Sequence, residues 1–481
     1  MEPGVLWAGA DDGLIHISRN NGETWTEVTP DGMPEAMASI IDPSPHDAAT
    51  AYLAANRYKF DDFSPMLYKT TNYGRSWTKI TNGIPEGDFT RVIREDPNKQ
   101  GLLYAGTETG VYVSFNDGEK WQPLQLNLPA VPITDLTVHK RDKDLIIATQ
   151  GRSFWVLDDL SVLHQLSDEV KNSDHYLYKP ETTYLFGRHS EPNPGETFGE
   201  NPKTGVVVYY NLNEVPESEV QLQFLESDGT VIRTLSNKER LDGTPVKESE
   251  NFYEEEHNVP GDVLTTKMGN NSFEWDLRYP GATDLDGTQI LWSGNTSGPR
   301  AIPGTYEVRL IVDGDVVGSK NFELTKDPRI ETTQEDFQAQ FDLHQTIIAK
   351  LDTTHKTINR IRKVRTQIND VKSDYSGNTE IQERADEMLK VLEEVESSLM
   401  QTKAESYQDV LNFPIKLNNK LAALASTVAT GDGRPTQQQY EVYVDLAAKV
   451  DAQLEKVSPI FDGELPNLIQ EIEQRAIPID N

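Results

Sequence analysis

The chain has 481 residues, which is enough for roughly three domains that each bury a core. Its 45 Lys and Arg residues against 78 Asp and Glu residues give a formal net charge of −33, so nucleic acid is a poor partner because phosphate binding needs clustered cations. The chain has no cysteine, which excludes disulfides and thiolate chemistry, no apolar run long enough for a membrane span, and no signal-peptide pattern in its first residues.

Three copies of one pattern dominate the first part of the chain: a small hydroxyl residue, then Asn two positions on, Gly four positions on and Trp seven positions on. The copies begin at Ser18, Thr70 and Ser114, which lie 52 and 44 positions apart. A period of about 40–50 residues built from short strands and turns predicts a β-propeller. The shared residues are Asn20, Gly22 and Trp25, then Asn72, Gly74 and Trp77, then Asn116, Gly118 and Trp121.

These repeated residues are expected to have a structural role. Asn tolerates the left-handed backbone conformation and Gly adopts positive φ, so that together they close a tight hairpin. The Trp is expected to pack between neighbouring sheets, with its indole N–H given to a backbone carbonyl. The pattern resembles the Asp-box, or bacterial neuraminidase repeat, with Asn in the usual place of Asp. It predicts the fold and leaves the activity open.

Four propeller blades are predicted over residues 1–170. The second and third contain all four strands that a blade requires, whereas the fourth is degenerate and has no Asp-box. The predicted strands are 39–41, 50–54, 66–70 and 77–80 in the second blade, 91–93, 102–105, 111–114 and 121–124 in the third, and 134–138, 145–149, 154–157 and, as a further candidate, 162–163 in the fourth.

The first blade lacks its innermost strand in this sequence. Residues 5–9 align with residues 102–106, which form a second strand in the third blade. Four blades with one strand absent leave sheet edges open, which soluble proteins avoid. We therefore expect the chain to be the C-terminal part of a longer propeller protein, or one piece of a split propeller that a partner chain completes. The alternative is a four-bladed ring closed by a later strand at 176–178.

The loops between the second and third strands of each blade lie on one predicted face. They bring carboxylates, two arginines and aromatic residues together, and such loops commonly carry binding or catalytic groups. Paired carboxylates there suit glycoside hydrolysis if they lie about 5–10 Å apart, and an arginine suits an anionic group, whereas the alternative is that these residues only form turns and salt bridges. The candidate residues are Asp11, Asp12, Arg57, Tyr58, Asp61, Asp62, Glu108 and Arg152.

Beyond the propeller, a connector rich in Pro and polar residues is predicted at 171–195. Alternating apolar runs and Asp-Gly turns then predict an immunoglobulin-like or fibronectin-like β-sandwich over 196–326, with an acidic loop near 248–259. Asp284–Gly287 lacks the ligand spacing of an EF-hand, and neither a metal site nor a cofactor is predicted.

Helical periodicity begins at Thr333 and predicts an antiparallel helical bundle over 327–481. His344 lies on the apolar stripe of the first helix, and we interpret it as a buried or rim histidine rather than a ligand. We interpret the apolar stripes of these helices as the core of the bundle rather than as surfaces for a partner. The later helices are predicted at 381–399, 408–429 and 436–457.

The whole chain resembles the C-terminal half of bacterial secreted proteins described as sortilin-like or glycosyl-hydrolase (BNR, Asp-box) repeat proteins. This resemblance implies a periplasmic, cell-surface or secreted location. It does not carry a catalytic residue over, because neither the arginines and Tyr–Glu pair of sialidases nor the paired aspartates of xyloglucanases can be assigned in this sequence. The segments that carry the likeness are 6–13, 94–97, 103–108, 148–159, 275–280 and 326–329.

The sequence therefore favours an extracytoplasmic binding protein whose propeller face engages a glycan or a peptide. One alternative is a glycoside hydrolase that uses carboxylates of that face. Another is a structural scaffold subunit whose propeller is completed by a partner chain. The identity of the ligand, the existence of a reaction and the oligomeric state do not follow from the residues.

Overall fold

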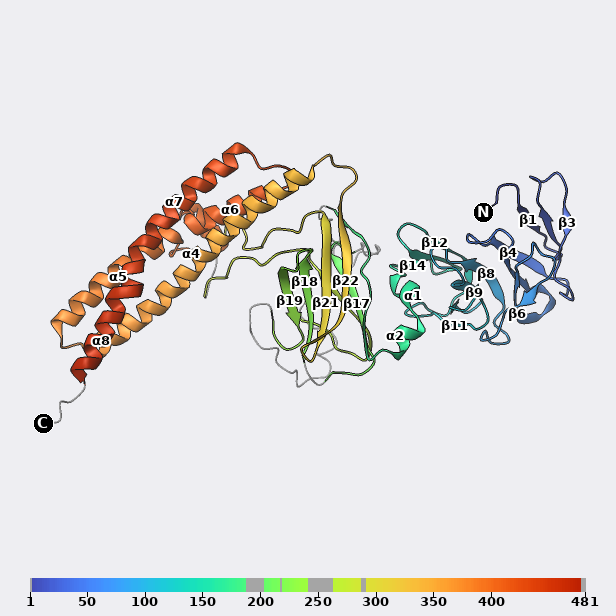
Figure 1. Ribbon diagram of the computed structural model, residues 1–481, viewed down its shortest axis with the longest axis horizontal. Coiled ribbons are helices and arrows are strands. Elements are labelled where there is room, and N and C mark those ends of the chain that lie inside the picture. The colour runs from blue at the N-terminus through green and yellow to red at the C-terminus, as the bar shows by residue number, and fades with distance from the viewer. Residues whose placement is uncertain (1, 187–202, 217–218, 241–262, 287–290, 477–481) are drawn as a thin grey trace. The chain divides into compact units, whose positions relative to one another are not determined.

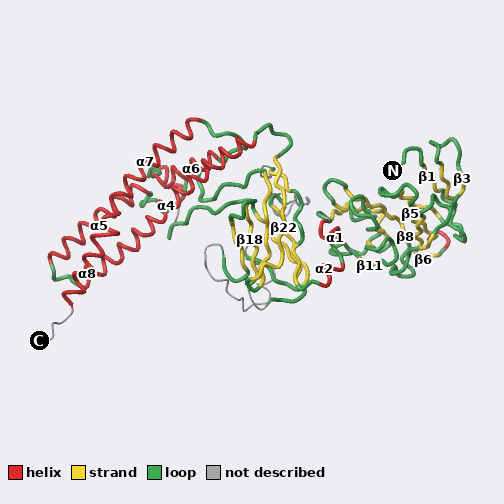
Figure 2. Tube along the Cα trace, viewed as in Figure 1, coloured by secondary structure: helices red, strands yellow, loops and turns green. Residues whose placement is uncertain are grey.

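Figure 1 shows a computed structural model of the protein, which describes residues 2–186, 203–216, 219–240, 263–286 and 291–476. The chain divides into two compact units, Met1–Asn172 and Ser173–Asn481. The first unit is built mainly of strands, whereas the second contains strands followed by long helices (Figure 2). The expectation of a mainly β protein with a helical C-terminal region is confirmed.

The first unit contains four antiparallel sheets in which each strand pairs with the next strand along the chain. The first sheet comprises β1 (Leu6–Gly9), β2 (Ile15–Ser18) and β3 (Thr26–Glu27). The second comprises β4 (Met37–Pro43), β5 (Ala51–Arg57), β6 (Asp62–Thr70) and β7 (Thr78–Lys79). The third comprises β8 (Thr90–Glu95), β9 (Leu103–Thr107), β10 (Val111–Ser114) and β11 (Gln122–Pro123), and the fourth β12 (Ile133–His139), β13 (Asp144–Thr149) and β14 (Phe154–Leu157).

The first sheet has three strands, and within the described residues no strand pairs with the free edge of β1. One strand expectation is wrong: residues 162–163 belong to helix α1 (Ser161–Gln165). Just before this helix the carboxylate of Asp159 accepts a hydrogen bond from Ser161 N at 3.0 Å and turns the chain. The strand of the alternative four-bladed ring is present as β15 (His175–Leu177), but it pairs with β17 (Val206–Leu212) of the second unit.

The Asp-box turns are closed by side chains that accept backbone hydrogen bonds. The hydroxyls of Ser18, Thr70 and Ser114 accept from the backbone N–H of the box glycines at 2.8, 2.9 and 2.9 Å. The box asparagine side chains accept from the N–H four residues later, at 3.0 Å in every copy. The box asparagines themselves are not left-handed. The non-glycine residues with positive φ in these turns are the ones that directly follow them, Asn21, Tyr73 and Asp117, with φ of 58, 62 and 60°.

The box tryptophans join each sheet to the sheet before it. Trp77 Nε1 donates to the carbonyl of Val28 at 2.7 Å, and Trp121 Nε1 donates to the carbonyl of Ile80 at 2.6 Å. Both acceptors directly follow the outer strand of the preceding sheet, β3 or β7. The apolar faces of successive sheets therefore share buried clusters, in which Trp121 is only 2% exposed.

The inner strand of the second, third and fourth sheets contains a β-bulge near its start. One residue of each strand has no partner in the pairing register: Ser39 in β4, Arg91 in β8 and Thr134 in β12. A bulge bends its strand and re-aims the side chain of the extra residue. The three inner strands thus bend at one place in the repeat.

The strands of the second unit form two sheets that share one core. One sheet comprises β15, β17 and β20 (Gly269–Trp275). The other comprises β16 (Thr183–Leu185), β22 (Asp315–Lys326), β21 (Gly304–Val312), β18 (Val220–Glu226) and β19 (Val231–Ser236). Phe224 and Trp275 stack in this core with their ring centroids 4.7 Å apart. The acidic loop expected near 248–259 lies outside the described residues.

The helical region begins with α4 (Gln334–Asp374), whose first turn is stabilised by a capping box between Thr333 and Asp336. The helix expected at 408–429 is instead a 3₁₀ turn at Tyr407–Leu411 followed by α6, because Pro414 between them supplies no N–H. The remaining helices are α2 (Asp168–Asn172), α5 (Thr379–Leu399), α6 (Leu417–Val428), α7 (Gln437–Pro459) and α8 (Leu465–Ala476), the last of which was not anticipated. None of the described helices is long and apolar enough to cross a membrane.

Replacing a box tryptophan should destabilise the first unit only where another sheet covers it. Trp121→Ala removes a buried ring and leaves the Ile80 carbonyl without its donor, so we expect a loss of about 3–5 kcal/mol in the free energy of unfolding. The matched control is Trp25→Ala, because Trp25 is 44% exposed and should cost about 1 kcal/mol or less. Urea unfolding followed by circular dichroism measures both, and equal losses would contradict the inter-sheet role.

Candidate ligand-binding face

Exposed aromatic rings gather where the second and third sheets meet. The loop between β5 and β6 makes a short 3₁₀ turn, η1 (Tyr58–Phe60), which Asp61 ends with φ of 59°. Tyr58 stacks on Phe89 with ring centroids 5.3 Å apart and an interplanar angle of 20°, and Phe63 lies 6.0 Å from the same ring. Phe89 is buried, whereas Tyr58 and Phe63 are 37% and 42% exposed. These three rings are called the aromatic platform below.

Two arginine–carboxylate pairs lie next to the aromatic platform. Arg57 Nη1 contacts Asp62 Oδ2 at 2.7 Å, and its Nε donates to the carbonyl of Glu35. Arg91 donates twice to Glu108 Oε2, from Nε at 2.8 Å and from Nη2 at 2.6 Å. The Arg91 guanidinium also lies 5.0 Å from the Phe89 ring centroid, in the range of a cation–π contact.

A buried carboxylate fixes the loop that carries Glu108. Asp88, 5% exposed, accepts hydrogen bonds from the hydroxyls of Thr107, Thr109 and Tyr112 and from the Thr109 backbone N–H, at 2.8–3.1 Å. The Glu108 N–H donates to the carbonyl of Phe89 at 3.1 Å. Phe89 of the platform and its acidic neighbour are thus parts of one hydrogen-bonded structure.

The structure brings together five of the eight residues that the sequence singles out. Arg57, Tyr58 and Asp62 lie at the platform, Asp61 ends its turn, and Glu108 reaches it through Arg91. Three others are held elsewhere. In the part of the chain that the structure describes, no hydrogen bond or ion pair links Asp11, Asp12 or Arg152 to the platform; Asp12 accepts from Leu14 N at 3.1 Å, and the Arg152 N–H and carbonyl bond to Thr149 and Trp155 within their own sheet.

Sequence reasoning missed Phe89 and Arg91. Both lie at the start of an inner strand, where an apolar residue and a charged residue are ordinary features of a strand. Their position in the chain could have pointed to them, because each connection from one predicted blade to the next runs beside the loops of the predicted face. Phe60 and Phe63 belong to the same loop as Tyr58. That their side chains are 54% and 42% exposed is visible only in the structure.

The carboxylate of Asp62 is suited to accepting hydrogen bonds rather than to acid catalysis. Hydrogen bonds from Ser64, and then the Arg57 guanidinium, lower the pKa of Asp62 below its usual range. Hydrolysis of a glycosidic bond requires a carboxylic acid whose pKa is raised, so that it carries a proton at neutral pH. The described residues also contain no group of three His, Asp or Glu side chains placed to hold a metal ion.

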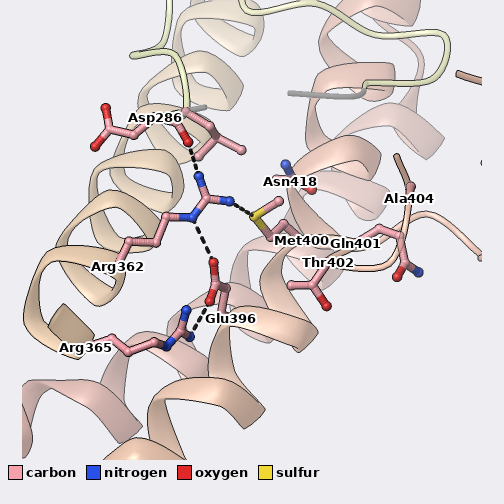
Figure 3. Close-up of a pocket in the computed structure, with 10 residues that line it drawn as sticks. Asp286, Arg362, Arg365, Glu396, Met400, Gln401, Thr402, Ala404 and Asn418 are labelled. Atoms are coloured by element: carbon pink, nitrogen blue, oxygen red, sulfur yellow. Dashed lines mark hydrogen bonds and ion pairs between the residues drawn. The ribbon is translucent and has the colours of Figure 1, made fainter. Parts of the chain in front are cut away.

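A separate cavity of about 520 Å³ lies beside α4 and α5 of the second unit (Figure 3). Its buried charge is Glu396, 5% exposed, which pairs with Arg362 Nε at 2.9 Å and with Arg365 Nη2. Arg362 also donates to the carbonyl of Asp286 and to Met400 Sδ, so that its three nitrogens are all used. This arrangement attaches the 285–286 segment to the helices, and we regard it as structural.

His344 is buried in the second unit, with 5% exposure. Burial, and then the nearby Arg278 guanidinium, lower the pKa of His344 to about 4, so its imidazole is neutral at physiological pH. The sequence placed this residue on the apolar stripe of α4, and the structure agrees with a buried histidine.

No protein-family model matches the chain, and no curated protein matches it. The solved structures to which it is similar are β-propeller proteins. They include YCF48 bound to D1 peptide (14% identity, TM-score 0.25, covering 49% of this chain and 66% of that one) and the GH74 xyloglucanase from Xanthomonas campestris (17%, 0.28, 33% and 26%). A third is the Cps50 (Swd1) β-propeller domain of Myceliophteria thermophila (14%, 0.28, 51% and 71%). The chain spans less than two thirds of the first two, and scores this low carry no argument about function.

Removing the charge of Glu396 should destabilise the second unit. In Glu396→Gln the side chains of Arg362 and Arg365 lose the carboxylate that they share, and we expect a loss of about 2–3 kcal/mol, less than for a fully buried pair because both arginines are partly exposed. Glu394→Gln on the same helix is the control, since its pair with Lys456 is largely exposed and should contribute little. Chemical unfolding measures both variants; equal stability of Glu396→Gln and the parent would contradict the structural role.

Acid should weaken the second unit through His344. Its pKa is about 4 when folded and its ordinary value is 6.5, so between these values the unfolded chain binds more protons and stability falls as the pH is lowered. No stability is lost through this group above pH 6.5, and the loss reaches at most about 3 kcal/mol near pH 4. Urea midpoints at pH 7 and pH 5 should therefore diverge more for the parent than for His344→Gln, and parallel behaviour would contradict the assignment.

Proposed function

We propose that the four sheets of the first unit are blades of a β-propeller and that the aromatic platform makes this unit a glycan-binding module. The observation that carries the proposal is the pair of exposed rings, Tyr58 and Phe63, held against the buried ring of Phe89. A soluble protein gains nothing by exposing such rings together unless a ligand covers them. The blade assignment is supported by the repeated Asp-box and by the tryptophan bonds between successive sheets.

Glycans match the chemistry of this face better than other ligands do. Sugar rings present flat apolar faces that stack on exposed aromatic rings, and they present hydroxyls around their edges that need directional donors and acceptors. The platform supplies both kinds of contact, because Arg57 with Asp62 and Arg91 with Glu108 lie next to it. Each pair offers donors and acceptors that are already oriented, and no net charge that would select an ion.

Binding is favoured over hydrolysis by the state of the Asp62 carboxylate. Asp62 and Glu108 each accept charge-assisted hydrogen bonds from an arginine. The lowered pKa of Asp62 removes it as a proton donor to a leaving sugar. A glycoside hydrolase on this face would therefore need a different acid, which the proposal does not require.

Replacing one exposed ring should weaken glycan binding without unfolding the protein. We expect Tyr58→Ala and Phe63→Ala each to lower the affinity for the best ligand of a glycan array by about tenfold or more, which corresponds to ~1.4 kcal/mol. Phe154→Ala is the control, because Phe154 is 77% exposed and lies on the fourth sheet outside the platform. Isothermal titration calorimetry of the full chain measures the affinities, and thermal unfolding checks the folded state.

Three outcomes separate the candidates. Loss of affinity in both ring variants and not in the control supports the proposal. Binding of a peptide library with the same dependence on Tyr58 and Phe63, and no glycan binding, would replace the glycan with a peptide ligand. Release of reducing sugar from a bound glycan would show that the face is catalytic, and the binding-only proposal would then be wrong.

A further inference from the structure

We infer that the first sheet is a docking surface for one more sheet of the same repeat, supplied from outside residues 1–481. The incoming sheet would pack on Trp25 and Gly22, and the strand that follows it would pair with the free edge of β1. This inference rests on the assignment of the sheets as propeller blades, and it is independent of ligand binding at the aromatic platform.

Trp25, the box tryptophan of the first sheet, lies in the same sequence pattern as Trp77 and Trp121. Among the described residues it does not make their hydrogen bond to a preceding sheet. Trp77 and Trp121 donate to a carbonyl of the preceding sheet and are largely or fully covered. Trp25 is 44% exposed, and among the described residues its Nε1 has no acceptor. Since the three turns are closed by the same hydrogen bonds, the difference lies in the missing neighbour and not in the box itself.

The box glycines give the same result independently. A Cβ on Gly74 would lie 2.7 Å from the Val28 side chain, and a Cβ on Gly118 would lie 2.6 Å from the Ile80 side chain, so each turn is pressed against the residue that follows the preceding outer strand. A Cβ on Gly22 would approach only Leu6 and Trp25 of its own sheet, at 3.7 Å or more. The first Asp-box turn therefore has room for an apolar residue like Val28 or Ile80, and among the described residues none contacts it there.

One edge of strand β1 is likewise uncovered. In the pairing registers β1 occupies the place of β5 and β9, since each precedes the strand that ends in the box hydroxyl residue. All residues of β9, and all but the last of β5, are buried, whereas Leu6, Ala8 and Gly9 of β1 are exposed. Both β5 and β9 pair with an inner strand, β4 or β8, and β1 has none within the described residues. An open apolar edge is a site for strand addition.

The occupant is defined by what the other sheets supply. The segment from β7 to β8 provides both contacts to the third sheet, because the Ile80 carbonyl accepts from Trp121 and β8 pairs with β9. A second copy of this chain does not fit, since within the described residues its fourth sheet ends at β14, with no outer strand to present to Trp25. Two chains that each carry a net charge of −33 would also repel one another.

A synthetic peptide of residues 78–97, which spans β7, Ile80 and β8, is the probe for this surface. We expect saturable binding of the fluorescently labelled peptide to the full chain by anisotropy, and slower hydrogen–deuterium exchange of the β1 amides when it is bound. Trp25→Ala should weaken this binding by about tenfold, whereas Phe154→Ala on the fourth sheet should leave it unchanged. A scrambled peptide is the control for composition.

Each other outcome overturns the inference. Absence of saturable binding up to about 1 mM peptide, or equal binding by the parent and Trp25→Ala, would show that the surface does not accept such a segment. Slow exchange of β1 in the chain alone would show that the chain covers this edge itself, and a dimer that Trp25→Ala dissociates would make a second copy the occupant. Failure here is distinguishable from failure of the glycan proposal, because Tyr58→Ala should retain peptide binding and Trp25→Ala should retain glycan binding.

Discussion

The hydrogen bond from a box tryptophan to the sheet before it is the interaction on which the first unit depends. The Asp-box turn presents the indole in a fixed direction, and the glycine at the tip lets the turn approach its neighbour closely. Each bond therefore fixes the spacing of two sheets rather than the shape of one. The aromatic platform is a result of that spacing, because Tyr58 and Phe63 belong to the second sheet and Phe89 leads into the third.

Much of the fold could be predicted because its signals are local and periodic. The second and third sheets have their strands within a few residues of the expected positions, since the repeat fixes both the turns and the alternation of buried side chains. The errors arose where one residue outweighed the pattern. Asp159 turns the chain into a short helix where a strand was expected, and Pro414 shortened the helix that was expected to begin near 408. The short α8 after Pro459 was missed because its apolar pattern covers only three turns.

The candidate site was harder to predict, because it depends on which loops meet. The sequence identified Arg57, Tyr58 and Asp62 as members of one loop, but the ring on which Tyr58 stacks comes from the next repeat. Trp25 makes the same point in reverse. Its box cannot be distinguished from those of Trp77 and Trp121 in the sequence, and only the structure shows that one of the three is uncovered. A sequence pattern within one repeat carries no information about which residues of two different repeats touch each other.

The bulge in each inner strand places one side chain per repeat outside the backbone register. Arg91 is the residue that the bulge of β8 leaves outside the register, and the corresponding residues of β4 and β12 are Ser39 and Thr134. A residue at that place lies outside the backbone register, and its side chain bonds instead to the neighbouring strand or to the loop after it. Ser39 Oγ accepts from Asn56, Thr134 Oγ1 donates to the carbonyl of Ala148, and Arg91 pairs with Glu108. One position per repeat thus links the inner strand to the next part of its sheet, with a hydroxyl in two repeats and a guanidinium in the third.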